Sequence, residues 1–387
     1  MNKKELELYI HIPFCVRKCS YCDFLSAPAT EQTREAYMAA LFAEIGGRAK
    51  DYSDRTVTSI FIGGGTPSLL SGEQIGQLMD RIREQFAMAQ DAEITMEVNP
   101  GTASAEKLRN FYTAGINRLS IGMQSAQAEE LKNLGRIHDF EGFCQVYREA
   151  VEAGFTNINV DIMSGLPGQT LASYRDTLEK VLHLEPMPQH ISAYSLIVEE
   201  GTPFAAMAER GELPLPEEET ERAMYEETIE VLAKYGFHRY EISNYARDGY
   251  ECRHNVGYWT RRDYLGFGIG AASLIDNVRF QNEKSLGAYL AHPLESREEE
   301  QTLTVQDRME ETMFLGLRLT RGVSCVDFAE QYGRTVEEVY GEVIARNVAD
   351  GLLTVTERKE NQKKDRFLAL TKRGLDLSNY VMAQFLF

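Results

Sequence analysis

A chain of 387 residues is long enough to bury a full hydrophobic core and to form two domains. Its hydrophobic content of 43% is typical of a globular protein, and no apolar run reaches the length of a membrane span. The formal net charge of -18 argues against nonspecific nucleic-acid binding, which needs clustered Lys and Arg. Residues 1–5 lead into a strand without a secretory or transit segment, so we expect a cytoplasmic protein.

A strand pattern opens the chain, and a cysteine cluster follows it. Apolar residues alternate along one face of this strand, at Leu6, Leu8, Ile10 and Ile12. Pro13 would end the strand, and three cysteines then fall within eight residues, at Cys15, Cys19 and Cys22. The loop therefore follows the carboxyl end of a strand, where parallel α/β folds place their sites.

Three interpretations of the cysteine cluster compete. A disulfide is disfavoured, because Cys144, Cys252 and Cys325 are scattered and a cytosolic chain keeps its thiols reduced. Structural zinc needs four ligands, and although His11 could supply the fourth, no second Cys-x-x-Cys pair exists. The third interpretation is a [4Fe–4S] cluster, for which one short loop supplies three thiolates and leaves one iron open to a small molecule.

Strand and helix patterns alternate beyond the cysteine loop. Further strands are predicted at 56–62, 93–98, 116–121, 156–161 and 190–196, with helices at 31–49, 72–86, 103–114, 126–134, 141–153 and 171–184. Six strands alternating with helices predict βαβ units and a parallel sheet. A closed eight-stranded barrel would need two more repeats, so the predicted fold class is α/β, with a partial, open (β/α)6 barrel.

Several motifs resemble those of a known family. Cys-x3-Cys-x2-Cys resembles the radical SAM signature, in which the open iron of a [4Fe–4S] cluster chelates S-adenosylmethionine (SAM). Together with it, the segments 9–15 (YIHIPFC), 63–68 (GGGTPS) and 165–170 (GLPGQT) resemble the HemN/HemW branch of radical SAM proteins. The resemblance covers essentially the whole chain and implies a partial barrel, a [4Fe–4S] cluster on the three cysteines and bound SAM.

Nine positions match the family's SAM contacts. They are Tyr9, Tyr21, Gly64, Gly65, Thr66, Glu97, Gln124, Arg136 and Asp161. The resemblance implies that Tyr21 contacts the adenine side, that residues 64–66 bind the methionine amino group and that Arg136 holds the carboxylate. It also implies that Asp161 binds the ribose. Without the resemblance, Glu97 and Asp161 would be interpreted as helix caps or turn residues, and Arg136 as part of a surface ion pair.

Two branches of the family are separated by further features. The oxygen-independent coproporphyrinogen III oxidases carry another cysteine two residues after the third, where this chain has Phe24, and a long arm before the cluster, where only 14 residues precede Cys15. The chaperone-like branch carries His-Asn-x-x-Tyr-Trp, present here at residues 254–259. The resemblance therefore implies a heme chaperone, with the oxidase and a cluster protein without SAM turnover as alternatives.

The resemblance also implies partners. Imidazole is a standard axial ligand of heme iron, so His254 is the candidate heme ligand and Cys252 its rival. Heme, client hemoproteins and an electron donor such as a flavodoxin or ferredoxin are the expected partners, without nucleic acid. The sequence leaves open a homodimer and peripheral membrane contact during heme delivery.

The remainder of the chain is predicted to form a connecting segment and a small domain. The glycine-rich segment 263–273 resembles the family segment that closes over the SAM site, and the charged stretch 295–300 predicts a linker. Helices at 305–319, 327–332 and 336–350 precede strands at 352–355 and 367–370 around a basic turn, 358–366, which resembles a winged-helix module. We expect a barrel at 1–235, a connecting segment at 236–300 and a C-terminal α+β domain at 301–387.

Overall fold

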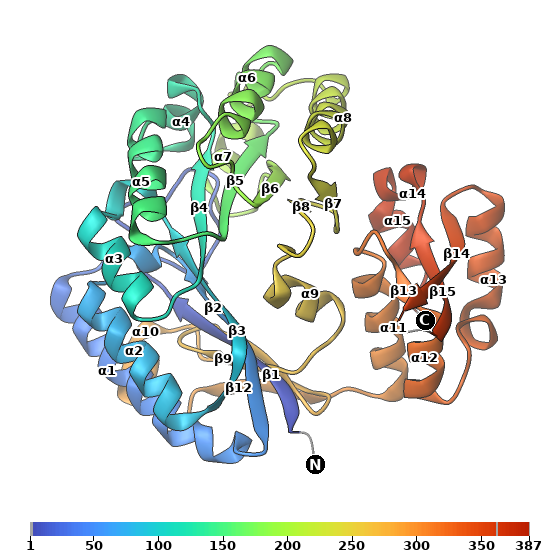
Figure 1. The fold of residues 1–387 in the computed structure, drawn as a ribbon, viewed down its shortest axis with the longest axis horizontal. Coiled ribbons are helices and arrows are strands. Elements are labelled where there is room, and N and C mark those ends of the chain that lie inside the picture. Colours follow the sequence, from blue (N-terminus) through green and yellow to red (C-terminus); the bar gives the residue numbers. More distant parts are fainter. Residues whose placement is uncertain (1–2, 361–362, 387) are drawn as a thin grey trace.

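The computed structural model describes residues 3–360 and 363–386, and its centre is an open sheet of parallel strands wrapped by helices (Figure 1). The parallel strands pair in chain order: β1 (Lys4–Ile12), β2 (Arg55–Gly64), β3 (Ala87–Val98), β4 (Arg118–Gln124), β5 (Ile158–Ser164) and β6 (His190–Ser195). The predicted α/β class and partial (β/α)6 barrel are confirmed.

Helices on the outer face of the sheet cover its apolar side chains. They are α1 (Glu31–Arg48), α2 (Gly72–Gln85), α3 (Ala105–Thr113), α4 (Ala128–Leu134), α5 (Phe140–Ala153) and α6 (Leu171–Leu182), with short 3-10 turns η1 (Ala49–Tyr52), η2 (Pro67–Leu69) and η3 (Pro100–Thr102). Thr30, Ser71 and Thr170 cap three of the helices through their hydroxyl oxygens, as such residues do before a first helical turn. The alternating residues of β1, from Leu6 to Ile12, are fully buried.

Short strands that the sequence patterns did not predict extend the sheet at both edges. Beside β1 lie β9 (Tyr264–Phe267), β10 (Ala272–Ile275), β11 (Val278–Asn282) and β12 (Arg297–Thr302), and beyond β6 lie β8 (Asn244–Ala246) and β7 (His238–Arg239). The predicted linker at 295–300 is wrong, because most of it belongs to β12. This strand is exposed along its length and carries a run of glutamates, which suits an edge strand because charge discourages further pairing.

The C-terminal domain has its own core and its own sheet. It contains α11 (Val305–Gly316), β13 (Val323–Ser324), α12 (Cys325–Tyr332), α13 (Val336–Ala349), β14 (Leu353–Glu360), β15 (Lys363–Leu370), α14 (Lys372–Asp376) and α15 (Ser378–Ala383). Three helices followed by a hairpin agree with the predicted α+β module. The tip of the predicted basic turn, 361–362, lies outside the described residues. None of the described helices is both long enough and apolar enough to cross a membrane.

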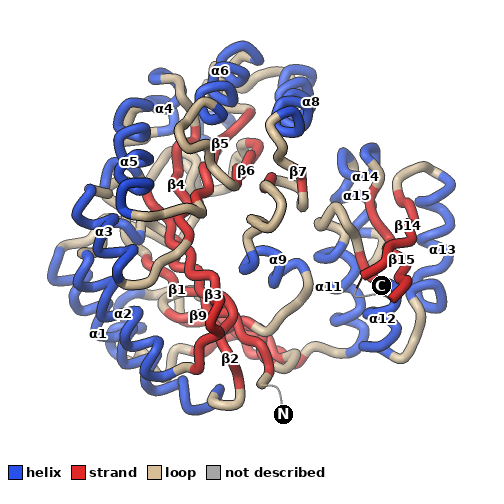
Figure 2. Tube along the Cα trace, viewed as in Figure 1, coloured by secondary structure: helices blue, strands red, loops and turns tan. Residues whose placement is uncertain are grey.

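Four more helices complete the fold: α7 (Pro203–Glu209), α8 (Glu218–Lys234), α9 (Arg253–Trp259) and α10 (Leu286–Ala291). One of them, α9, lies between the two domains. Helix α9 contacts both β2 and α11, and Figure 2 shows it between the barrel and the C-terminal helices. The guanidinium of Arg318 lies 4.3 Å above the ring of Trp259 and 3.8 Å from the Glu241 carboxylate, so this contact fixes the docking of the C-terminal domain.

A buried carboxylate ties α1 to the added strands. Glu44 is fully buried, and its two oxygens accept hydrogen bonds from the Asn282 amide (2.7 Å), the Tyr289 hydroxyl (2.7 Å) and the Gly268 N–H (2.9 Å). The Arg48 guanidinium lies 2.9 Å from the same carboxylate. The Glu44 carboxylate therefore accepts hydrogen bonds from three neutral donors and balances the charge of Arg48. Loss of the carboxylate would leave a buried guanidinium without a counter-charge.

We therefore expect Glu44→Ala to lower the free energy of unfolding by about 3–5 kcal/mol, because it breaks a buried ion pair and leaves the donors that bonded to Glu44 without an acceptor. Denaturant unfolding followed by circular dichroism measures the change. Glu35→Ala, an exposed position on the same helix, is the matched control and should stay within about 0.5 kcal/mol of the parent. Equal losses in the two variants would contradict this role of Glu44.

Candidate functional site

The cysteine loop is held at the mouth of the barrel by backbone hydrogen bonds. The N–H of Cys15 donates to the Ala27 carbonyl (3.2 Å), and the N–H of Ser20 donates to the Leu134 carbonyl (3.0 Å). Three half-buried thiols, those of Cys15, Cys19 and Cys22, line one cavity of about 140 Å³, which we call the thiol cavity. Burial, together with the other two cysteines of the loop, raises the pKa of the Cys22 thiol.

The predicted site residues gather around this cavity. All of them line it except Tyr9 and His254: besides the three cysteines these are Tyr21, Gly64, Gly65, Thr66, Glu97, Gln124, Arg136 and Asp161. Tyr21 comes from the cysteine loop, Asp161 from the middle of β5 and Arg136 from the loop after α4, and the others come from the carboxyl ends of β2, β3 and β4 or the turn after β2. Parallel strands bring residues that are far apart in the chain to a single edge of the sheet.

Glycine is required where β2 leaves the sheet. Gly64 has a φ of 111°, and a Cβ there would lie 2.6 Å from the His11 ring. A Cβ on Gly65 would lie 2.6 Å from the Phe14 carbonyl oxygen. The N–H groups of Gly64 and Gly65 donate to Glu97 (3.1 Å) and to the Ile12 carbonyl (2.8 Å). An ammonium group donates hydrogen bonds, so it would contact the carbonyl oxygens of Gly64 and Gly65 rather than their N–H groups.

Arg136 has a donor available for a ligand. Its Nη2 donates to the Gly122 carbonyl (2.7 Å), and its Nη1 lies 3.8 Å from the Cys19 sulfur. Its Nε is buried and has no hydrogen-bond partner among the described residues. A buried donor without an acceptor is costly, so this atom fits a carboxylate oxygen supplied by a ligand.

Two acidic residues share the cavity. Burial and the neighbouring Asp161 raise the pKa of Glu97 to about 8, against the opposing effect of the Gly64 N–H. Burial also raises the pKa of Asp161, whose oxygen accepts a 2.6 Å hydrogen bond from the Asn159 amide. Gln124 stands nearby in a left-handed backbone conformation, with a φ of 70°, which is a sign of strain often found at functional sites.

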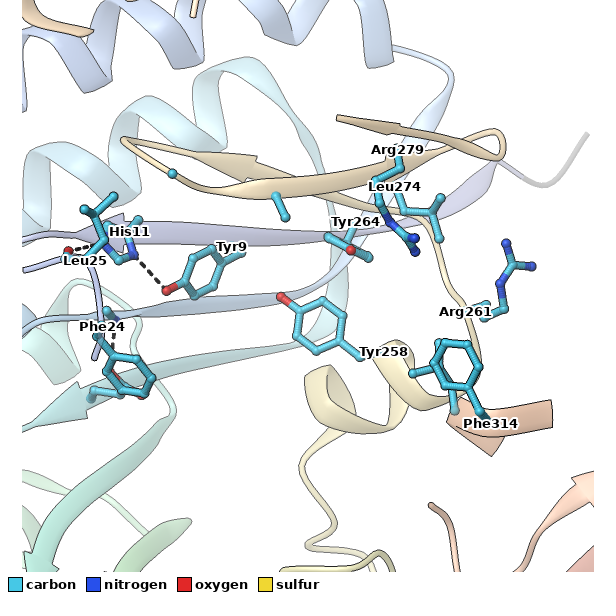
Figure 3. Close-up of a pocket in the computed structure, with 15 residues that line it drawn as sticks. Tyr9, His11, Phe24, Leu25, Tyr258, Arg261, Tyr264, Leu274, Arg279 and Phe314 are labelled. Carbon is cyan, nitrogen blue, oxygen red and sulfur yellow. Dashed lines mark hydrogen bonds between the residues drawn. The ribbon is translucent and has the colours of Figure 1, made fainter. Parts of the chain in front are cut away.

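Tyr9 lines a second cavity, which we call the lateral cavity (Figure 3). It has a volume of about 560 Å³ and lies between β1, the glycine-rich segment, α9 and α11. Phe24, Gly64 and Glu97 line both cavities, so the two adjoin. The glycine-rich segment 263–273, which includes β9 and the start of β10, contributes Tyr264, Gly270 and Ala272 to the lateral cavity and no residue to the thiol cavity.

His254 is fully engaged within the protein. Its side chain is 1% exposed, and its ring stacks on Phe61 at a centroid distance of 5.3 Å. Hydrogen bonds link its Nδ1 to the Ser59 hydroxyl (2.8 Å) and its Nε2 to the Tyr258 hydroxyl (3.0 Å). Burial lowers its pKa to about 3, so the imidazole is neutral. Both nitrogens are occupied, and Tyr258 lines the lateral cavity whereas His254 does not.

The rival heme ligand is buried as well. Cys252 is fully buried, and its thiol lies 3.5 Å from a carboxylate oxygen of Glu93. Burial raises the pKa of this thiol to about 12, which disfavours the thiolate needed for ligation.

Sequence patterns missed the charged wall of the lateral cavity. Arg261 and Arg279 line this cavity, and both pair with Glu311 of α11. Arg261 follows the His-Asn-x-x-Tyr-Trp motif by two residues, which was the only local signal. Arg279 and Glu311 lie in segments whose sequence patterns predict no site.

The donor set of the loop consists of three cysteine thiols, which are the ligands that iron–sulfur clusters use. In residues 3–360 and 363–386, no three His, Cys, Asp or Glu side chains converge tightly enough to hold one metal ion. The three thiols line the wall of a cavity that Arg136 also lines, and the Nε of Arg136 has no hydrogen-bond partner among the described residues. A partial parallel barrel with three cysteine thiols in one loop at the carboxyl ends of its strands defines the class of radical SAM proteins.

Comparison with known proteins agrees with this class. A family model for the radical SAM superfamily matches residues 9–181, and one for the HemN C-terminal domain matches 303–377. Heme chaperone HemW of Bacillus subtilis is 38% identical over 98% of both chains, and that of Lactococcus lactis is 36% identical over 100% of this chain and 98% of its own. The structure of Escherichia coli coproporphyrinogen III oxidase HemN, described as a radical SAM enzyme, superposes with a TM-score of 0.84 at 27% identity, covering 100% of this chain and 91% of that one. The chain belongs to the HemN/HemW family of radical SAM proteins, as its motifs predicted.

The raised pKa of Glu97 predicts a pH-dependent stability difference. Because folding raises this pKa from 4.5 to about 8, the stabilising contribution of Glu97 is fully present below about pH 4.5 and is lost as pH rises through about 8. Glu97→Gln cannot ionise and keeps the neutral form. The unfolding temperature of this variant relative to the parent should therefore rise between about pH 5 and about pH 9, by roughly 2–4 °C.

Differential scanning fluorimetry of cluster-free protein measures this difference. Glu152→Gln, an exposed change on α5, is the control and should give a difference that does not vary with pH. A flat profile for Glu97→Gln would show that Glu97 is already ionised in the folded chain at neutral pH.

Proposed function

We propose that the chain is a heme chaperone that binds heme, a [4Fe–4S] cluster and SAM and hands heme to client hemoproteins. The observation that carries the proposal is the extent of its likeness to curated heme chaperones, 36–38% identity over nearly the full length of both chains. The side chain of Phe24, where the oxidases carry a further cysteine, is 59% exposed at the border of the two cavities.

Cys15, Cys19 and Cys22 are the proposed cluster ligands. A cluster with SAM supplies one-electron chemistry when bound, fed by a donor such as a flavodoxin or ferredoxin. The protein's part is to bind and orient: the Nε of Arg136 would donate to the methionine carboxylate and Asp161 would accept from ribose hydroxyls. Glu97 and Gln124 would complete the polar wall, with Tyr21 on the adenine side. Tyr9 lines the lateral cavity, which adjoins this site and shares Gly64 and Glu97 with it.

Heme binding by His254 requires a local rearrangement. The Nε2 of His254 is hydrogen-bonded to the hydroxyl of Tyr258, a residue that lines the lateral cavity. Ligation of heme iron would therefore break the 3.0 Å hydrogen bond and turn the Tyr258 ring aside. A neutral imidazole is the form that binds iron, and the burial that lowers the His254 pKa maintains that form.

The cluster prediction is tested by anaerobic reconstitution with iron and sulfide. We expect about four irons per chain and a reduced EPR signal that changes when SAM is added. Cys19→Ser should lose both, whereas Cys144→Ser, a half-buried thiol on α5, should keep both. Incubation of the parent with coproporphyrinogen III, SAM and reductant should yield no protoporphyrinogen; its formation would favour the oxidase.

The heme prediction is tested by titration with heme. His254→Ala should shift the Soret band and weaken binding by about tenfold, through loss of the iron ligand. Tyr258→Phe removes the competing hydroxyl, so it should bind heme at least as tightly as the parent and keep the parent spectrum. Quenching of Trp259, the only tryptophan, gives an independent reading. An unchanged spectrum in His254→Ala would remove this residue from the heme site.

A further inference from the structure

Two guanidinium groups on the wall of the lateral cavity share one carboxylate. The Nε of Arg261 lies 2.9 Å from one oxygen of Glu311, and the Nη1 of Arg279 lies 2.7 Å from the other. A further acidic group near Arg279 is Asp307, which is half-buried and accepts a hydrogen bond from the Thr304 N–H (2.7 Å) at the start of α11. The cluster of Arg261, Arg279 and Glu311 alone therefore carries one positive charge in excess, in a protein whose net charge is -18.

Arg261 is the more confined of the two. Its side chain is 4% exposed, and its Nη2 is buried without a hydrogen-bond partner in the described part of the chain. Its backbone is left-handed, with a φ of 55°. A buried guanidinium donor without an acceptor, carried on a strained backbone, marks a group held ready for a ligand. The missing partner is an anionic oxygen.

The remaining wall of the cavity is largely apolar. Leu274, Phe314 and Tyr258 line its length, and Figure 3 shows the two arginines at one end and Phe24 with Leu25 at the other. The volume of about 560 Å³ falls in the range of roughly 300–1,000 Å³ typical of sites for small organic ligands. A flat apolar molecule that carries carboxylates on one edge matches both the shape and the charge.

We propose that the lateral cavity binds the tetrapyrrole and that Arg261 and Arg279 hold its propionate side chains. This inference rests on the proposed heme binding and adds the place and orientation of the ligand. The methionine carboxylate of a second SAM could also pair with the arginines. SAM, however, brings a sulfonium and an ammonium, which an apolar wall with excess positive charge disfavours.

Propionate recognition is tested by altering both the ligand and the protein. The parent is titrated with heme, with iron-free protoporphyrin IX and with protoporphyrin IX dimethyl ester, in which the carboxylates are blocked. The ester should bind the parent about tenfold more weakly than the free acid, because each charge-assisted hydrogen bond is lost. Since this comparison needs no substitution, it stands even if a variant fails to fold.

Arg261→Gln and Arg279→Gln should each weaken binding of heme and of protoporphyrin IX by about tenfold and should leave ester binding unchanged. Arg262→Gln is the matched control: Arg262 neighbours Arg261 but lies outside the cavity, paired with Glu5 at 3.0 Å. It should bind all three ligands like the parent.

Three results would overturn the inference while heme binding stands: an ester as tightly bound as the free acid, arginine variants that bind heme like the parent, or displacement of the porphyrin by SAM in cluster-free protein. A parent chain that binds neither heme nor porphyrin would instead overturn the proposed function, and this inference with it.

Discussion

The close approach of two backbones at the end of β1 is the constraint on which the site depends. The N–H of Gly65 donates to the Ile12 carbonyl at 2.8 Å, and no side chain fits between this turn and Phe14. The cysteine loop therefore leaves β1 against the carboxyl end of β2, with the Thr66 hydroxyl 3.6 Å from the Cys15 sulfur. One pair of glycines thus sets the distance between the three thiols and the polar residues of the next strands.

Three buried groups of the barrel interior are shifted toward their neutral forms. Burial raises the pKa of Glu7 and of Glu97 to about 8 and lowers that of His254 to about 3, so all three are largely neutral at neutral pH. Both oxygens of Glu7 lack hydrogen-bond partners among the described residues. Arg118 is fully buried in the same interior and stays charged, because neighbouring acidic groups raise its pKa against the effect of burial. Arg261, Arg279 and Glu311 form a separate charged cluster, at the wall shared with the C-terminal domain.

Local sequence patterns located the six parallel strands and the helices between them, because apolar residues recur in these segments at the spacing of a strand or a helix. The strands added at the edges are short, and β12 is charged throughout, so pairing rather than pattern creates them. The residues of the two cavities differ in the same way, because sequence patterns predicted those of the thiol cavity and not the charged wall of the lateral cavity. Residues of the thiol cavity lie at strand ends, where parallel folds place function. The wall formed by Arg261, Arg279 and Glu311 exists only after three distant segments meet. No pattern could show that His254 would be buried with both nitrogens occupied.

The His-Asn-x-x-Tyr-Trp motif divides its members between the two domains. Tyr258 faces the lateral cavity, while the Trp259 ring lies under Arg318 of the C-terminal domain. Helix α11 supplies Phe314 to the cavity and Glu311 to the two arginines. The C-terminal domain is therefore one wall of the cavity, and a ligand bound there would touch both domains. The Trp259–Arg318 contact and the Glu311 ion pairs therefore hold together the two domains that line this cavity.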